Sequence, residues 1–325
     1  MLSSIVRRLL QTIGVVLVMS ALVFAALYMI GDPVLMLASP EAGDAERELI
    51  RQSFGLDLPL WRQYLIFLNK VFVHLDFGKS FLTGEPAIGL ILDRMPATLE
   101  LATAAMLFAV LIGVPLGIYA GLKPESFGAR SVMTGSVLGF SLPNFWVGLM
   151  LIMVFAVFLH WMPAGGRGPV QAFGPIQLSI FSWAGWRSLI LPVATIAVAK
   201  CALIVRVTRA ATRECLPQDY IKFARARGLS EARVLGVHLL KNILIPIVTV
   251  AGLEYGQVFA FAVVTESVFS WPGMGKLLID SIITLDRPVV VAYLILTVVF
   301  LSLLNLVVDV IYTILDPRVQ SKARA

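Results

Sequence analysis

The stretch LELATAAMLFAVLIGVPLGIYAGL (residues 99–122) decides the fold class of this chain. It is long and apolar enough to cross a membrane as a helix, since about 20 apolar residues span the hydrocarbon core. Five further runs have the same character. The predicted spans are Leu9–Ile30, Leu99–Leu122, Val132–Trp161, Ser188–Val207, Ile243–Val268 and Val289–Ile314. The sequence therefore predicts an all-α polytopic membrane protein with about six transmembrane helices.

The composition supports this interpretation and argues against a soluble protein. Of the 325 residues, 58% are hydrophobic and 14% are charged, and the mean hydropathy is +0.88. Soluble domains carry about 25% charged residues. The net charge is +6, but the basic residues flank apolar runs and form no patch interleaved with aromatic residues, so we expect no nucleic-acid partner. The two cysteines and three histidines are scattered, which predicts neither a disulfide nor a zinc site.

The basic residues also predict the orientation of the spans. With six spans, the N-terminus, the segment 208–241 and the C-terminal tail lie on one side, and 208–241 alone has a net charge of +4. Positive loops face the cytoplasm, so we expect both termini there and the acidic segment 32–97 outside. The expected organisation is residues 1–31 (N-terminus and an uncleaved first helix), 32–97 (periplasmic insertion), 98–314 (transmembrane core) and 315–325 (cytoplasmic tail).

The outer segment 32–97 is predicted to be partly helical. Asp44–Phe54 and Leu60–Val73 read as short amphipathic helices, and Pro59 is placed to start the second. The second helix is apolar enough to lie at the membrane interface, and its entry into the bilayer stays open at this point.

Enzymatic motifs are missing from the sequence. There is no G-x-S-x-G, no H-E-x-x-H and no phosphate-binding Walker A loop. The run Gly273-Met-Gly275-Lys276 resembles the end of such a loop, but Ser270 replaces its first glycine and Leu277 its Ser/Thr. We therefore expect this chain to bind no cofactor, and any ATP to be used by partner subunits.

The segment 208–241 carries the most specific local pattern. A helix from Asp219 is expected to end at Gly228, and Ser230 can cap a second helix. The result is a helix–turn–helix with a basic face, projecting from the membrane. Such an element transmits force when it docks into a groove on another protein. The alternatives are a merely solvated basic loop and a DNA-binding element, the latter improbable between two membrane spans.

This segment resembles the cytoplasmic signature of ABC importer permeases. Gly228 matches the glycine of that signature, Ala224 its second alanine and Leu240 its leucine. Departures from the general signature occur at Lys222, Phe223, His238 and Lys241. They fit the variant of the oligopeptide/dipeptide branch, in which the stretch resembles Asp219–Ser230 of this chain. Other stretches similar to that branch are Gly55–Pro59 with Gln63-Tyr64, Asp76–Ser80, Arg94–Leu99, Ser141–Gly148, Glu266–Gly275 and Asp316–Arg318.

The resemblance covers nearly the whole chain and implies a function. It implies a type I ABC importer permease fold in a bacterial inner membrane and a substrate class of peptides or similar small polar solutes. The implied partners are a second homologous permease, two ATP-binding subunits, a periplasmic or extracellular solute-binding protein and membrane lipid. The residues expected to couple to the ATPase are Asp219, Phe223, Ala224, Arg227, Gly228, Ser230, Arg233 and His238.

Polar residues inside the spans are candidates for the translocation path, because a charge at mid-bilayer costs at least about 2.5–3.5 kcal/mol and needs a cavity or a partner. The candidates are Asn144, Glu254, Gln257 and Asn305. Alternatively, Lys200, Glu254 or Asp309 pair within the bundle, or Lys200 and Asp309 reach toward an interface. Pro143 would either free carbonyls toward a cavity or simply kink the helix.

Two rival function classes remain at this stage. An ion-gradient-driven secondary transporter would show inverted repeats and act alone, but no repeat is evident. An intramembrane enzyme would need a nucleophile or a metal cluster at depth, and the sequence offers none.

Overall fold

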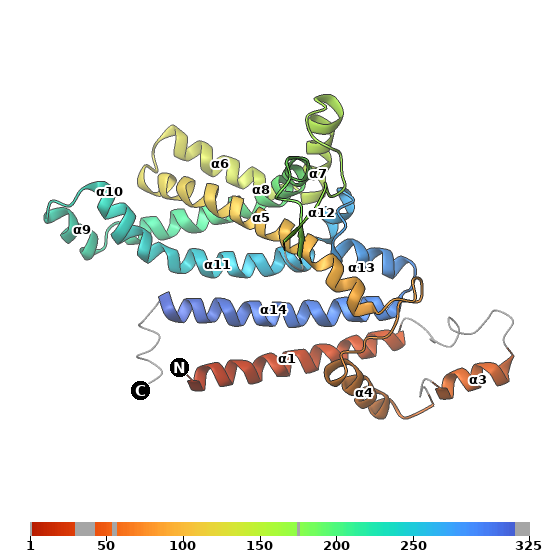
Figure 1. The fold of residues 1–325 in the computed structure, drawn as a ribbon. Coiled ribbons are helices and arrows are strands. Elements are labelled where there is room, and N and C mark those ends of the chain that lie inside the picture. Colours follow the sequence, from red (N-terminus) through yellow and green to blue (C-terminus); the bar gives the residue numbers. More distant parts are fainter. Residues whose placement is uncertain (1, 30–42, 54–56, 174–175, 316–325) are drawn as a thin grey trace. The chain divides into compact units, whose positions relative to one another are not determined.

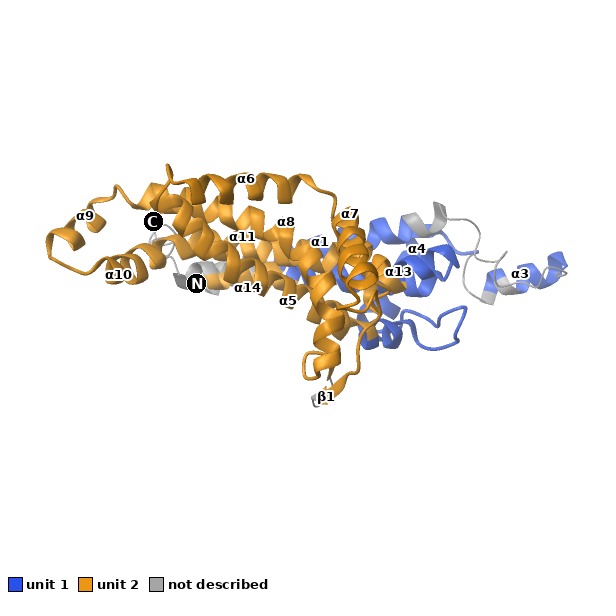
Figure 2. Ribbon diagram, turned by 90° about the horizontal axis from the view of Figure 1, so that it is seen from above, with its two compact units in different colours: residues 1–93, 278–302 blue, residues 94–277, 303–325 orange. Residues whose placement is uncertain are grey.

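The computed structural model describes residues 2–29, 43–53, 57–173 and 176–315 (Figure 1). The chain packs into two compact units, one of residues 1–93 with 278–302 and one of residues 94–277 with 303–325 (Figure 2). The boundaries of these two units differ from those of the four segments expected from the sequence (1–31, 32–97, 98–314 and 315–325). The boundaries of those four segments stay a prediction.

The first unit is built around two apolar helices. It contains α1 (Leu2–Met29), α3 (Asp44–Ser53), α4 (Leu60–Leu68) with the π-helical segment η1 (Asn69–Val73), and the N-terminal part of α14 (Arg287–Leu315). Helices α3 and α4–η1 occupy the two outer stretches predicted to be helical. The core of the unit is formed by Val23, Val71, Val291 and Ile295.

The second unit holds most of the chain. Its helices are α5 (Ala87–Leu122), α6 (Phe127–Ser141), α7 (Asn144–Leu151) with η2 (Ile152–Phe158), α8 (Trp183–Cys215), α9 (Asp219–Ala226), α10 (Glu231–Arg233) with η3 (Val234–Leu239), α11 (Leu240–Phe261), α12 (Val263–Val268) and the start of α13 (Met274–Ile283). Serine side chains cap two of them. Ser126 accepts from the Ala129 amide at 3.1 Å at the start of α6, and Ser182 accepts from the Gly185 amide at 2.9 Å at the start of α8.

Each of the six predicted spans coincides with a helix or a helix pair. Four helices in the described part of the chain are long and apolar enough to cross a membrane, and the bent pair α6 and α7–η2 makes a fifth candidate. Helix α1 has 28 residues, of which Leu10–Ala25 form its described apolar stretch. The helical membrane class predicted from the sequence is confirmed. The described residues also contain a short hairpin of β1 (Gln171–Phe173) and β2 (Ile176–Leu178).

The third predicted span is broken rather than straight. Helix α6 ends at Ser141, α7 begins at Asn144, and their axes differ by 103°. The break lies at Pro143, which lacks an amide hydrogen and favours the extended conformation found at Leu142 (φ −84°, ψ 132°). The chain is therefore broken at Pro143 rather than only kinked, and the reading that its freed carbonyls face a cavity stays a prediction.

Close packing of α5 on α8 organises the second unit. Glycines recur at every fourth position along α5, at Gly113, Gly117 and Gly121. A Cβ atom on Gly117 would lie 2.5 Å from Cβ of Thr208 and 2.8 Å from the Val205 carbonyl oxygen. The missing side chains thus let the two backbones approach, as small residues do in membrane helix pairs.

Candidate functional site: coupling segment and membrane-embedded polar groups

The predicted helix–turn–helix between α8 and α11 is present. Helix α9 ends at Ala226, and Gly228 adopts a positive φ of +74°, a conformation that side chains other than glycine rarely tolerate. The turn is closed by a double hydrogen bond from the Arg225 guanidinium to the Glu231 carboxylate, at 2.8 and 3.1 Å. This exposed ion pair joins the end of α9 to the start of α10 across the turn.

The second helix of this element continues into the fifth span, because α10, η3 and α11 form one continuous helix of 31 residues, Glu231–Phe261. It differs from the prediction at its start. Ser230 occupies the position before this helix, but its side chain makes no capping hydrogen bond. The first turn is instead held by the backbone, with the Ser230 carbonyl accepting from the Arg233 and Val234 amides.

The expected coupling residues fall on two sides of the element. Asp219, Phe223, Arg227, Gly228, Ser230 and Arg233 are exposed, and His238 is partly exposed. The Arg227 guanidinium stacks over the Phe223 ring at 4.5 Å from its centroid. Ala224, in contrast, is buried with Ile221, Val234 and Leu239 in the small core under the turn. An alanine at this position therefore serves the packing of the element rather than its surface.

Two charged residues of the spans pair with each other. The Lys200 ammonium on α8 donates to the Glu254 carboxylate on α11, and the two side chains are 17% and 14% exposed. Beside them, the hydroxyls of Thr103 and Tyr255 lie 3.0 Å apart. This is the pairing that the sequence left open as the alternative to a path role for Glu254. The other three path candidates, Asn144, Gln257 and Asn305, are exposed, and the side chain of Asp309 lies outside the described residues.

The sequence reasoning missed a buried acid at the start of the second span. Glu100 accepts hydrogen bonds from the Ser179 amide and hydroxyl at 2.7 and 2.9 Å, and from the Ile180 amide at 2.9 Å. Its second oxygen receives the Arg167 guanidinium at 2.6 Å. This network ties the hairpin loop to α5. The available signal was a lone carboxylate in an apolar run, which needs partners.

A second buried acid organises the turn after α12. Glu266 is fully buried and accepts from the Thr98 hydroxyl at 2.7 Å and from the Lys276 amide at 2.9 Å. Trp271, also fully buried, donates from its ring nitrogen to the Ala97 carbonyl at 2.9 Å. The Glu266–Gly275 stretch that resembles the family is thus the segment that folds around this carboxylate.

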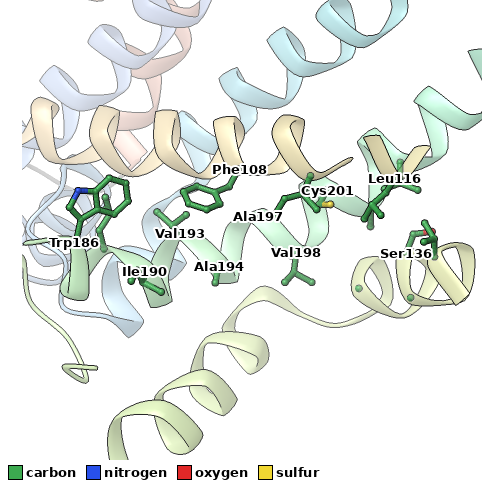
Figure 3. A pocket seen from close by; sticks show the side chains of 17 residues that line it. Phe108, Leu116, Ser136, Trp186, Ile190, Val193, Ala194, Ala197, Val198 and Cys201 are labelled. Carbon is green, nitrogen blue, oxygen red and sulfur yellow. The ribbon is translucent and has the colours of Figure 1, made fainter. Parts of the chain in front are cut away.

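An apolar cavity of about 710 Å³ lies between α5, α6 and α8 (Figure 3). Phe108, Val193 and Cys201 are among its lining residues. Its single side-chain hydroxyl, on Ser136, donates to the Met133 carbonyl of its own helix. The cavity contains none of the path candidates, and its lining offers nothing to a polar solute. Among the described residues there is also no cluster of three or more metal-ligating side chains.

Comparison with known families defines the class of this protein. Residues 113–321 match the family described as binding-protein-dependent transport system inner membrane component, and residues 1–102 match its N-terminal region. The chain belongs to this family, whose members are the membrane-spanning permease subunits of ABC importers. A stand-alone ion-gradient-driven transporter is thereby set aside.

Individual relatives cover essentially the whole chain. It is 41% identical over 334 residues to the di/tripeptide transport system permease protein DppB of Pseudomonas aeruginosa, covering 98% of this chain and 99% of that protein. Identity is 38% to both the dipeptide transport system permease protein DppB and the glutathione transport system permease protein GsiC of Escherichia coli K12, each covering 99% of this chain and 100% of the relative.

A solved structure supports the fold. The inward-facing MetNI methionine ABC transporter matches with a TM-score of 0.57 at 18% identity, covering 70% of this chain and 97% of that one. At this identity the match speaks for the fold alone. The fold class expected from the sequence, that of ABC importer permeases, is confirmed.

Proposed function

We propose that this chain is the permease subunit through which peptides of two or three residues, or small peptide-like solutes such as glutathione, enter the cell. The observation that carries the proposal is the 38–41% identity to permeases of dipeptide, di/tripeptide and glutathione transport systems over nearly their full length. The absence of an enzymatic motif in the sequence is consistent with this role.

The proposed complex has five components. This chain pairs with a second, homologous permease, two ATP-binding subunits bind the cytosolic side, and a solute-binding protein delivers the solute from outside. ATP is bound by the partner subunits, and this chain carries no cofactor and no ATPase site. Alternating access is the proposed mechanism, in which closure of the ATPases moves the membrane helices between inward- and outward-open states.

The coupling segment 208–241 is the proposed docking element for an ATPase subunit. Its exposed Phe223 and Arg227 offer an apolar ring and a charge on one small surface, as interface anchors commonly do. The exposed Arg225–Glu231 ion pair joins the two helices of the element across the turn. Gly228 permits the turn between the two helices.

The proposed orientation places both termini and the coupling segment in the cytoplasm. The net charge of +4 on 208–241 and the acidic balance of 32–97 support it. The exposed Trp161 and Trp183 flank the hairpin loop, which fits a membrane–water interface there without deciding its side.

A cysteine-labelling experiment tests the orientation. Leu82 is exposed and lies in the outer segment, so Leu82→Cys should react with a membrane-impermeant maleimide in intact cells. Arg233→Cys in the coupling segment should react only after lysis. The reverse pattern would contradict the proposed orientation.

The translocation path is proposed to involve Asn144, Glu254, Gln257 and Asn305. Asn144 follows the break at Pro143, and exposure of Gln257 and Asn305 in the single chain leaves both available to a solute or a partner. Glu254 enters this proposal as half of an ion pair rather than as a free carboxylate.

Uptake of a labelled dipeptide tests the solute class. A strain lacking its own peptide permeases should accumulate the dipeptide when it expresses this chain with its partner subunits, and unlabelled dipeptide or tripeptide should compete. Competition by glutathione alone would assign the narrower glutathione class. If the complex is assembled but the labelled dipeptide does not accumulate, and neither peptides nor glutathione compete for uptake, the proposal is contradicted.

A further inference from the structure

The segment Leu60–Val73 in the first unit has an apolar face that no described residue covers. Trp61 is 64% exposed, Leu65 54% and Phe72 39%. A spacing of four residues places Trp61 and Leu65 on one side of α4, whereas Phe72 lies in η1 and borders a groove shared with Leu17 of α1. An uncovered apolar face of this kind marks a surface that contacts a membrane or another protein.

The opposite side of the same segment is tied to α1. The Tyr64 hydroxyl lies 2.9 Å from the Ser20 hydroxyl and donates to the Leu17 carbonyl at 3.1 Å. The rings of Tyr64 and Phe67 pack on Phe24 at centroid distances of 5.3 and 5.6 Å. The segment is therefore anchored along α1 and does not project away from it.

The anchor points lie deep along α1. Helices rise about 1.5 Å per residue, so Leu17 lies roughly 18 Å from the helix end at Met29 and about 13.5 Å from Arg8. Arg8 precedes the apolar part of α1, and the hydrocarbon core is about 30 Å thick. Leu17 thus lies inside the hydrocarbon core, and the Tyr64 hydroxyl reaches it while the Tyr64 ring packs on Phe24, nearer the Met29 end of α1.

We infer that Leu60–Val73 enters the lipid bilayer and presents the exposed Trp61 and Leu65 side chains to the acyl chains. The inference goes beyond the proposed transport function, and it selects bilayer entry from the two placements that the sequence leaves open, the membrane interface and the bilayer. Beyond the first turn, backbone polar groups are satisfied inside the segment by its helical hydrogen bonds, as the bilayer core requires. Gln63 is also satisfied, since its side chain donates to the Leu58 carbonyl at 2.7 Å.

Two charged residues of the segment are compatible with this placement. Arg62 lies in the first turn after Pro59, and Lys70 lies near the other end. Both side chains are exposed. Long basic side chains at the ends of membrane helices extend their charged groups to the headgroup region while their aliphatic parts stay in lipid.

Site-directed spin labelling of the reconstituted complex tests the inference. A nitroxide is attached at Leu65→Cys, with Leu82→Cys as the matched control, in full complexes whose Cys201 and Cys215 are replaced by alanine. Leu82 is also an exposed leucine of the first unit, but lies in the loop after Ser80. Collisions with oxygen, which partitions into hydrocarbon, are compared with collisions with a water-soluble nickel chelate.

The expected result is an excess of oxygen over nickel collisions at position 65 and the opposite at position 82. Nickel access at position 65 would place the face in water and overturn the inference. Low access to both reagents would mean that protein, such as the second permease, covers the face, and would overturn it equally. As a second readout, Leu65→Asp should lower the yield of folded complex, whereas Leu82→Asp should not, because a carboxylate is costly only in hydrocarbon.

Discussion

The buried Glu266 carboxylate accepts a hydrogen bond from the Thr98 hydroxyl at 2.7 Å. The same hydroxyl accepts from the Met274 amide at 2.8 Å, and the second carboxylate oxygen accepts from the Lys276 amide at 2.9 Å. A Cβ atom on Gly273 would lie 2.2 Å from the carboxylate. The start of α13 therefore wraps a carboxylate that is bound to α5, and the glycine is what allows the close approach.

Glu266→Ala should destabilise the permease. It leaves the Thr98 hydroxyl and the Lys276 amide without their acceptor inside the protein, which costs about 1–3 kcal/mol for each buried group. The midpoint of thermal unfolding of the purified complex should fall. Glu214→Ala is the matched control, since Glu214 is exposed. Equal midpoints for the two variants would show that the network does not stabilise the fold.

Gly117→Ala should weaken the contact between α5 and α8. The added methyl group would overlap Thr208 and the Val205 carbonyl, and overpacking of this kind typically costs about 1–3 kcal/mol. Gly89→Ala is the control on the same helix, because nothing lies within 4 Å of a Cβ atom there. Only Gly117→Ala should lower the unfolding midpoint. A stable Gly117→Ala variant would mean that the two helices separate without cost.

The sequence was sufficient for the class of fold because hydropathy acts over whole segments. All six apolar runs became helices or helix pairs, since a backbone in lipid must satisfy its hydrogen bonds internally. The break at Pro143 was harder to predict, because proline kinks some membrane helices and interrupts others. The 103° bend depends on Leu142 becoming extended, which is a tertiary outcome.

The candidate site was predicted unevenly for a related reason. The local turn at Gly228 could be predicted, since it needs only a residue that tolerates a positive φ. The pairing of Lys200 with Glu254 joins positions 54 residues apart and depends on helix rotation, which hydropathy does not encode. Glu100 was missed because one acidic residue hardly changes the mean hydropathy of an apolar run. The free-energy cost of placing its carboxylate in lipid nevertheless implies a partner.

Replacing one member of the Lys200–Glu254 pair should be worse than replacing both. Lys200→Met leaves a partly buried carboxylate without its cation, and breaking a buried pair costs up to about 3–5 kcal/mol. The double variant Lys200→Met with Glu254→Leu removes both charges and should recover most of the stability. Thermal unfolding measures this recovery.

Dipeptide uptake by the same double variant separates the two roles of Glu254. If the pair is only structural, the recovered complex should transport normally. If Glu254 belongs to the translocation path, uptake should stay low despite a normal unfolding midpoint. Normal uptake would remove Glu254 from the proposed path.

Substitutions at Gly228 should uncouple ATP hydrolysis from uptake according to how well they tolerate its backbone. Gly228 has a φ of +74°, and nothing lies within 4 Å of a Cβ atom there, so the cost of a side chain is conformational rather than steric crowding. Valine is β-branched and disfavours this region strongly, whereas asparagine adopts it with little strain. We expect Gly228→Val to distort the turn that holds Phe223 and Arg227, and Gly228→Asn to preserve it.

The measurement is the ratio of dipeptide imported to ATP hydrolysed in proteoliposomes containing the full complex. The ratio should fall for Gly228→Val and stay near the unmodified value for Gly228→Asn, with equal amounts of permease assembled. Valine and asparagine both add a side chain at position 228, but only asparagine tolerates a positive φ. An equal fall of the ratio in both variants would therefore point to the loss of a surface contact at position 228. An unchanged ratio for Gly228→Val would remove the turn from the coupling mechanism.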